Sequence, residues 1–171
     1  MKENYKLTLR NITTFIFDID GVLTNGQILV TSEGELLRSM SVRDGFAFRR
    51  AIEEGYHICM ISGGKNEGVK KRLYNLGVTH IYLGIDDKVT QLNRFFKEHQ
   101  IKPENVAYMG DDIPDTYPMK IVGLPACPQN AEPEVKQIAV YVSHRNGGEG
   151  CARDLIEQVM KIQNKWHPKN L

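Results

Sequence analysis

Short apolar runs, separated by segments with helical spacing, make up most of this 171-residue chain. The first run, residues 12–17 (ITTFIF), is rich in β-branched and aromatic residues, which is typical of a strand buried on both faces. Similar runs predict further strands at residues 56–62 (YHICMIS), 80–84 (HIYLG) and 106–110 (VAYMG), and near 122–126 (VGLPA) and 139–143 (AVYVS).

Helices are predicted between these strands. Apolar residues at helical spacing run from 44 to 54 and from about 66 to 76, and Gly55 and Gly77 follow where each helix would end. Strands that alternate with helices need crossover connections, which favour a mostly parallel sheet. A chain of this length buries one core and is too short for two ordinary domains. We therefore expect an α/β fold, a single doubly wound, Rossmann-like domain over residues 1–171, with further helices at about 87–99, near 115–121, after Pro133 and from about 150 to 165.

One segment departs from this alternation. Residues 22–41 contain two extended-looking runs around Ser32-Glu33-Gly34, which predicts a projecting β-hairpin. Its apolar residues have no obvious cover within one small domain, so we expect the hairpin to serve in oligomerisation. These residues are Ile28, Val30, Leu36 and Leu37.

Composition and charge exclude several classes of protein. The chain has 41% hydrophobic and 25% charged residues and a formal net charge of +1, so a nucleic-acid or membrane surface is not its expected partner. Its three cysteines are odd in number and far apart, which fits neither a disulfide framework nor a zinc cluster. No run approaches the ~18 apolar residues of a membrane span, and no signal-peptide pattern is present. We expect a cytoplasmic protein.

Polar residues gather where the predicted strands end. Asp18 and Asp20 follow the first strand, Ser62 ends the second, Lys88 opens a helix, and Asp111 follows the strand at 106–110. In parallel sheets the carboxyl ends of the strands share one edge, and ligands bind in the crevice there. The sequence therefore predicts a single site built from these side chains.

Carboxylates, a hydroxyl and a lysine at one edge suit Mg²⁺ and phosphate. Mg²⁺ prefers oxygen ligands, so Asp18 and Asp111, with Asp20 beside them, are the expected metal-binding residues. Asp18 is placed to attack a phosphoryl group and form an aspartyl-phosphate. Residues i and i+2 of a strand share a face, so Asp20 could act there as general acid and then base.

The remaining polar residues would support this chemistry. The hydroxyl of Ser62 and the backbone N–H groups at Gly63 and Gly64 could bind the phosphate, and Lys88 could bind both the phosphate and the nucleophile. Asp112 and Asp115 would surround the metal ligands. Each residue also has an ordinary structural explanation as a turn, a helix cap or a solvated side chain, but the agreement of all motifs in order favours the catalytic one.

These motifs together resemble the haloacid dehalogenase (HAD) superfamily of phosphatases. The resemblance covers nearly the whole chain and leaves no room for the cap domain that many members insert. The motifs that carry it are DIDG (Asp18, Asp20), Ser62, Lys88 and GDDIPD (Asp111, Asp112, Asp115).

Two further segments, 41–49 (SVRDGFAFR) and 147–157 (GGEGCARDLIE), are similar to capless phosphatases of sugar-acid biosynthesis. This similarity implies hydrolysis of 3-deoxy-D-manno-octulosonate 8-phosphate to KDO and phosphate, as in lipopolysaccharide biosynthesis. It also implies a homotetramer with the hairpins at its centre and each site completed by a neighbouring subunit. The implied substrate contacts are Arg43, Asp44, Gly45, Arg49 and Arg72, together with Gly63 and Gly64.

Three other functions stay open on the sequence. At the position of Gly64, the octulosonate enzymes commonly carry arginine, and relatives acting on a nine-carbon ulosonate 9-phosphate tend to carry an acid. Gly64 fits neither pattern, so the chain length of the sugar is undecided. A capless site could also belong to a broad sugar phosphatase. A non-enzymatic phospho-receiver uses a similar set of residues, but it places the phosphoacceptor later in the chain than Asp18.

Overall fold

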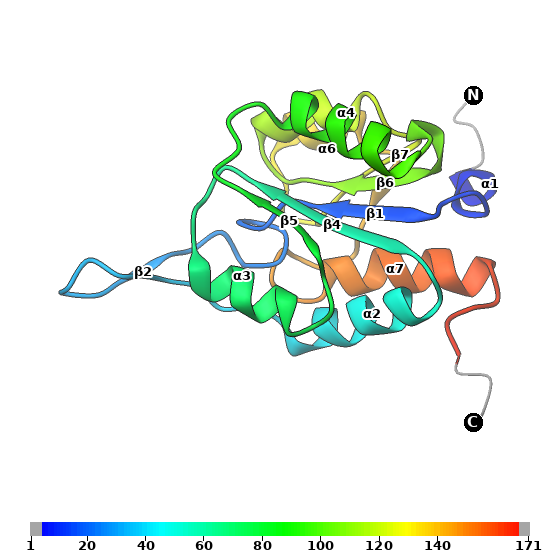
Figure 1. The fold of residues 1–171 in the computed structure, drawn as a ribbon. Helices are drawn as coiled ribbons and strands as arrows, with labels where there is room; N and C mark the ends of the chain where they lie inside the picture. The colour runs from blue at the N-terminus through cyan, green and yellow to red at the C-terminus, as the bar shows by residue number, and fades with distance from the viewer. Residues whose placement is uncertain (1–4, 168–171) are drawn as a thin grey trace.

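A six-stranded sheet forms the centre of the computed structural model, which describes residues 5–167; residues 1–4 and 168–171 of the expected domain lie outside the described residues. The strand order is β5-β4-β1-β6-β7-β8, and all neighbouring strands run parallel (Figure 1). The predicted parallel α/β sheet is thus confirmed. The strands are β1 (Thr14–Phe17), β4 (His57–Ser62), β5 (His80–Leu83), β6 (Val106–Met109), β7 (Leu124–Cys127) and β8 (Tyr141–Val142).

Strand β1 lies between β4 and β6 and is buried along its whole length. Alternate residues of a strand point to opposite faces, so Phe15 and Phe17 enter one core and Ile16 enters the other. The next backbone N–H, that of Asp18, donates to the carbonyl of Met109 at 3.0 Å. Asp18 is therefore fixed at the point where the chain leaves the middle of the sheet.

Helices cover both faces of the sheet (Figure 1). α2 (Val42–Glu53), α3 (Glu67–Tyr74) and α7 (Cys151–Ile162) lie on one face, and α4 (Lys88–His99), α5 (Thr116–Met119) and α6 (Pro133–Ile138) lie on the other. The helix expected near 115–121 is shorter, because its start forms a 3₁₀ turn at Ile113–Asp115 that includes Pro114. A second 3₁₀ turn spans Pro103–Asn105, and the short α1 (Tyr5–Leu9) was not predicted. Among the helices of residues 5–167, none has the length and hydrophobicity that a membrane crossing requires.

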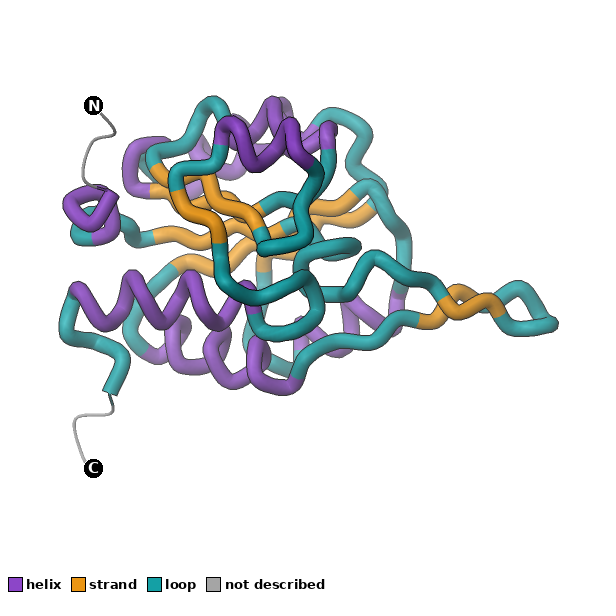
Figure 2. Tube along the Cα trace, turned by 180° about the vertical axis from the view of Figure 1, so that it is seen from behind, coloured by secondary structure: helices purple, strands orange, loops and turns teal. Residues whose placement is uncertain are grey.

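The hairpin consists of β2 (Leu29–Val30) and β3 (Leu36–Leu37) and extends away from the body of the domain (Figure 2). It is narrower than the predicted 22–41, because residues 22–24 are buried in the body and the hydroxyl of Thr24 accepts hydrogen bonds from the backbone N–H groups of Gly21 and Gly26. Both strands expose their apolar residues; Leu29 is 68% and Leu37 46% exposed.

Helix α7 is capped by a residue from another helix. Its N-cap, Gly150, has no side chain, and Asp44 of α2 instead accepts a hydrogen bond from the backbone N–H of Arg153 at 2.7 Å. Asp44 is 2% exposed, and its second oxygen has no hydrogen-bond partner among the described residues. Burial raises the pKa of Asp44 to about 6, from 3.8.

We expect Asp44→Ala to lower the free energy of unfolding by about 1–2 kcal/mol near pH 5, because α7 loses its cap. Since the pKa of Asp44 is higher in the folded than in the unfolded state, its stabilising contribution is complete below pH 3.8 and is lost as pH rises through about 6. Asp44→Asn keeps a capping oxygen and should remove this pH dependence. Urea unfolding at several pH values measures both effects, and an alanine variant as stable as the wild type would contradict the assignment.

Candidate active site

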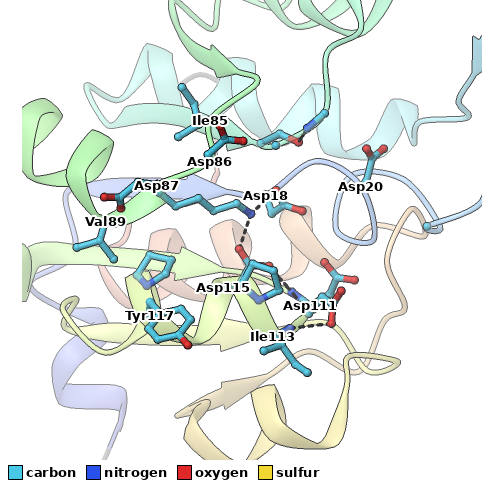
Figure 3. A pocket seen from close by; sticks show the side chains of 18 residues that line it. Asp18, Asp20, Ile85, Asp86, Asp87, Val89, Asp111, Ile113, Asp115 and Tyr117 are labelled. Carbon is cyan, nitrogen blue, oxygen red and sulfur yellow. Dashed lines mark hydrogen bonds and ion pairs between the residues drawn. The ribbon is translucent and has the colours of Figure 1, made fainter.

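The polar residues predicted from the strand ends lie around one cavity of about 810 Å³ (Figure 3). It opens at the carboxyl ends of β1, β4 and β6, as the parallel topology requires. The cavity brings together most of the residues expected from the motifs. Those that line it are Asp18, Asp20, Ser62, Gly63, Gly64, Lys88, Asp111, Asp112 and Asp115.

Lys88, the first residue of α4, connects two carboxylates. Its ammonium donates to Asp18 Oδ1 at 2.8 Å and to Asp115 Oδ1 at 2.7 Å (Figure 3). The hydroxyl of Tyr108, which is fully buried, donates to the same oxygen of Asp115 at 2.7 Å. Asp115 is 1% exposed, so the ammonium of Lys88, the hydroxyl of Tyr108 and the carboxylate of Asp115 meet in a nearly dry environment.

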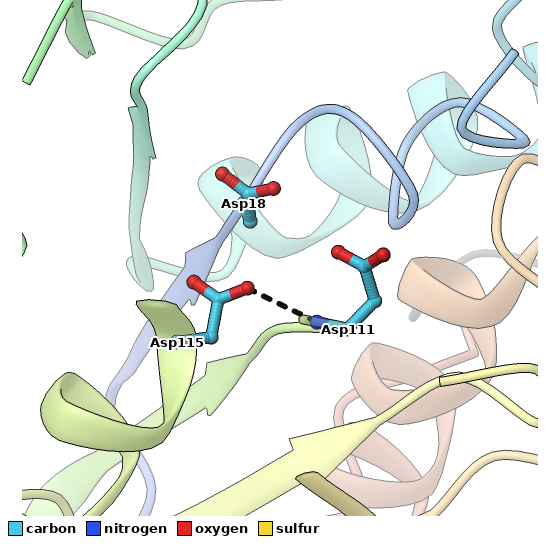
Figure 4. Close-up of side chains that lie close together, drawn as sticks. All are labelled: Asp18, Asp111 and Asp115. Carbon is cyan, nitrogen blue, oxygen red and sulfur yellow. Dashed lines mark hydrogen bonds between the residues drawn. The ribbon is translucent and has the colours of Figure 1, made fainter. Parts of the chain in front are cut away.

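Asp111 approaches this pair from the end of β6. Its backbone N–H donates to Asp115 Oδ2 at 3.1 Å (Figure 4). One carboxylate oxygen from each of Asp18, Asp111 and Asp115 lies within 4.8 Å of the others. Asp111 Oδ1 is buried and accepts no hydrogen bond from a described residue.

The charge at this cluster is not balanced by the protein. Burial, with the neighbouring Asp115, raises the pKa of Asp18 to about 7, and burial, with Asp18, raises the pKa of Asp111 to about 8. Lys88 lowers both pKa values but does not restore them to the usual 3.8. A buried oxygen without a partner and an excess of negative charge suit a small, hard divalent cation, and Mg²⁺ fits this set of donors.

Gly21 explains part of the DIDG motif. Its φ is +89°, a conformation that favours glycine, and a Cβ at this position would collide with the carboxylate of Asp111. The glycine after Asp20 therefore lets Asp111 approach the turn that follows β1.

Asp20 does not join the acidic cluster. β1 ends at Phe17, so Asp18 and Asp20 both lie beyond the strand. They therefore do not share a strand face, contrary to the prediction. Arg38 binds both oxygens of Asp20, at 2.7 and 3.2 Å, and the Asp20 carboxylate points away from Asp18 and Asp111 (Figure 3). The acidic cluster of the described residues consists of Asp18, Asp111 and Asp115, and the expected role of Asp20 as a metal ligand stays a prediction.

Ser62 and Asp112 combine a cavity position with a local structural role. Ser62 is buried at the end of β4, and its Oγ accepts a hydrogen bond from the backbone N–H of Gly64 at 3.2 Å. Asp112 is exposed and accepts from the backbone N–H of Ile113 at 2.7 Å, which caps the 3₁₀ turn. Their roles in catalysis stay predictions.

Of the expected substrate contacts, Gly63 and Gly64 line this cavity and the other five lie outside it. Asp44 caps α7, Gly45 packs near Leu76, and Arg49 donates to the carbonyl of Asn75 at 3.3 Å. Arg43 lines a second cavity, and Arg72 lines a third beside the hairpin. Substrate binding by these residues is therefore still a prediction.

Two residues at the site were missed. Arg38 belongs to no motif and reaches Asp20 only because the hairpin returns to the body of the domain. Tyr108 was assigned simply to a strand, although a hydroxyl inside a fully buried strand needs a hydrogen-bond partner, and that requirement was the available signal.

Known proteins are similar to this chain in sequence. Residues 80–155 match the family model described as haloacid dehalogenase-like hydrolase. The chain is 37% identical over 155 residues to the 3-deoxy-D-manno-octulosonate 8-phosphate phosphatase of Salmonella typhi, covering 91% of this chain and 82% of the relative. The corresponding enzyme of Yersinia pestis is 35% identical over 155 residues, with 91% and 83% covered.

Solved structures are similar over almost the whole chain. The phosphatase of the same name from Yersinia pestis superposes with a TM-score of 0.93 and 33% identity, covering 96% of this chain and 89% of that one. The enzyme from Moraxella catarrhalis, in complex with magnesium, phosphate and KDO, gives a TM-score of 0.91 and 31% identity, with 94% and 92% covered.

We expect Mg²⁺ to bind more tightly as pH rises from about 6 to 8, with release of protons. The cation requires ionised carboxylates, and in its absence the pKa values of Asp18 and Asp111 are about 7 and about 8. Isothermal titration calorimetry in buffers of different ionisation enthalpy counts the protons. Asp111→Asn should abolish binding, whereas Asp86→Asn, which removes an exposed carboxylate lining the same cavity, should change it little. Equal losses in both variants would contradict the cation site.

Proposed function

Because this chain belongs to the haloacid dehalogenase-like hydrolases, in the family of the 3-deoxy-D-manno-octulosonate 8-phosphate phosphatases, we propose that it hydrolyses that sugar phosphate to KDO and phosphate. The observation that carries the proposal is the cluster in which Lys88 bonds to Asp18 and Asp115 while Asp111 keeps a buried, unpaired oxygen. A phosphomonoesterase that works through a carboxylate nucleophile needs this combination of charges.

Asp18 and Asp111, with Asp115 beside them, would hold Mg²⁺, which offsets the negative charge of the phosphoryl oxygens. Lys88 orients Asp18 by its bond to Oδ1, which leaves Oδ2 as the attacking oxygen. A bond forms between this oxygen and phosphorus, and the bond from phosphorus to the sugar oxygen breaks. The protein is left with a phosphorylated Asp18 and the free sugar acid.

Proton transfer is the task that we assign to Asp20. It gives a proton to the departing sugar oxygen and takes one from the water that then attacks the phosphorylated Asp18. That attack breaks the bond from the aspartate oxygen to phosphorus and regenerates the carboxylate. Ser62 and the backbone N–H of Gly63 line the cavity where they can donate to the phosphoryl oxygens.

Recognition of the sugar acid is proposed to involve a second copy of the chain. Arg43, Arg49 and Arg72 lie outside the cavity of their own chain, and the hairpin presents exposed apolar residues to a partner. A homotetramer packed through the hairpins would bring such arginines to the site of a neighbouring subunit, where they could bind the carboxylate of the substrate. The three cysteines, all buried and free, support a reducing, cytoplasmic location.

We expect EDTA to abolish phosphatase activity and Mg²⁺ to restore it, and Asp18→Asn to fold normally without turnover. Among substrates, octulosonate 8-phosphate should have the highest kcat/KM, ahead of a nine-carbon ulosonate 9-phosphate and simple hexose phosphates. Phosphate release measures each rate. Equal rates on all three would favour a broad sugar phosphatase, and a higher rate on the nine-carbon ester would replace the proposed substrate.

We expect the wild type to be a tetramer at micromolar concentration and the double variant Leu29→Asp, Leu37→Asp to be a monomer, because charge on these exposed residues prevents burial of the hairpin. Light scattering after size-exclusion chromatography gives the molar mass. Leu7→Asp, a change at an exposed leucine of α1, is the matched control and should remain tetrameric. A monomeric wild type would contradict the assembly.

A further inference from the structure

Asp20 is held by an arginine from the base of the hairpin. Arg38 Nε donates to Asp20 Oδ1 at 2.7 Å, and Nη2 donates to Oδ2 at 3.2 Å. The side chain of Arg38 is only 6% exposed, although the residue follows an exposed hairpin strand, and that of Asp20 is 34% exposed. Such two-point contacts fix the plane of a carboxylate as well as its position.

Arg38 is itself held in place. Its Nη1 donates to the carbonyl of Leu36 at 3.1 Å, and the same carbonyl accepts from Asn66 Nδ2 at 3.0 Å. Asn66 also caps α3 by accepting from the backbone N–H of Val69 at 2.9 Å. All three nitrogens of the guanidinium are thus hydrogen-bonded, and the base of the hairpin is held to the start of α3 through Asn66.

The absence of a side chain at Gly64 makes room for this pair. A Cβ there would lie 2.9 Å from Asp20 Oδ2, closer than such atoms approach, and 3.7 Å from Arg38 Nη2. The same Cβ would lie 3.5 Å from Ser62 Oγ. Asp20 and Ser62 both line the cavity wall next to Gly64, and a side chain at position 64 would require the Asp20 carboxylate to shift.

This wall is the appropriate place for a proton donor. In phosphoryl transfer the attacking and leaving oxygens are roughly in line, so the leaving oxygen lies on the far side of phosphorus from Asp18. In Figure 3 the Asp20 carboxylate points away from Asp18 and Asp111, and we assign the leaving oxygen to the part of the cavity that Asp20 lines. Arg38 uses one lone-pair direction of each Asp20 oxygen, and a carboxylate keeps others for proton transfer.

We propose that Arg38 is the positioning residue of Asp20: it fixes the carboxylate at the leaving-group side of the cavity and so connects the hairpin to proton transfer. This inference rests on the proposed phosphatase function. It makes the base of the hairpin part of the working site, independently of any contact that its exposed strands make.

The test compares an ester that needs proton donation with one that does not. An alkoxide such as the sugar oxygen leaves poorly without a proton, whereas p-nitrophenolate leaves unaided, and kcat/KM reports the steps up to the first irreversible release. Arg38→Met should lower kcat/KM for octulosonate 8-phosphate by about tenfold to a hundredfold, part of the range typical of general acid catalysis. For p-nitrophenyl phosphate the loss should stay below about threefold, and Arg38→Lys should recover part of the activity on the sugar phosphate.

A double-mutant cycle separates positioning from a structural effect. With Asp20→Asn already present, Arg38→Met should cause almost no further loss, because the group that Arg38 positions is gone. Arg94→Met removes an arginine–glutamate pair on the exposed face of α4 and serves as the matched control, with unchanged activity on both esters. Thermal unfolding and molar mass are measured for every variant.

Equal losses on the two esters, additive losses in the cycle, or a rate increase in Arg38→Met would each overturn the positioning role. Such results with an active wild type would leave the proposed function intact. Failure of the wild type to hydrolyse any phosphate ester would overturn both proposals.

Discussion

The balance of charge at the carboxyl ends of β1 and β6 is the constraint on which the site depends. When Asp18, Asp111 and Asp115 are all ionised, their three negative charges and the single ammonium of Lys88 give a charge of −2. Two like charges about 4 Å apart repel by about 4 kcal/mol at an effective dielectric constant of 20. The protein offsets only part of this repulsion, as the raised pKa values of Asp18 and Asp111 indicate. A divalent cation carries the two positive charges that are missing.

The hydrogen bonds divide the carboxylates into two kinds. Asp115 accepts from Lys88, Tyr108 and the backbone of Asp111, so both of its oxygens are satisfied by the protein. Asp111 keeps one buried oxygen without a partner. Asp115, whose oxygens are all bonded, is suited to orient Lys88. Asp111 is suited to bind an added ligand, because its buried oxygen can gain a new partner without breaking an existing hydrogen bond.

Sequence alone predicted the sheet and half of the residues that line the cavity, among them the lysine and the carboxylates of the cluster. Both follow from local pattern, since buried parallel strands are short apolar runs and their carboxyl ends meet at one edge. The contacts that it missed join residues far apart in the chain. Arg38 meets Asp20 across 18 positions through the returning hairpin, and Asp44 meets Arg153 across 109. Periodicity describes which face a residue lies on, but it carries no information about which distant polar group completes a hydrogen bond there.

The hairpin contacts the site at its base and presents its strands to the proposed assembly. Each of its strands has only two residues, and a two-stranded hairpin is marginally stable in isolation, so its conformation must be fixed from outside. At its base, Asn66 and Asp20 supply that support through Leu36 and Arg38. At its apolar strands the described residues supply none, which is why the proposed assembly packs there. The proposed positioning of Asp20 therefore depends on the base of the hairpin, where Arg38 is bonded to Asp20 and to the carbonyl of Leu36, and not on the contacts that the exposed strands make.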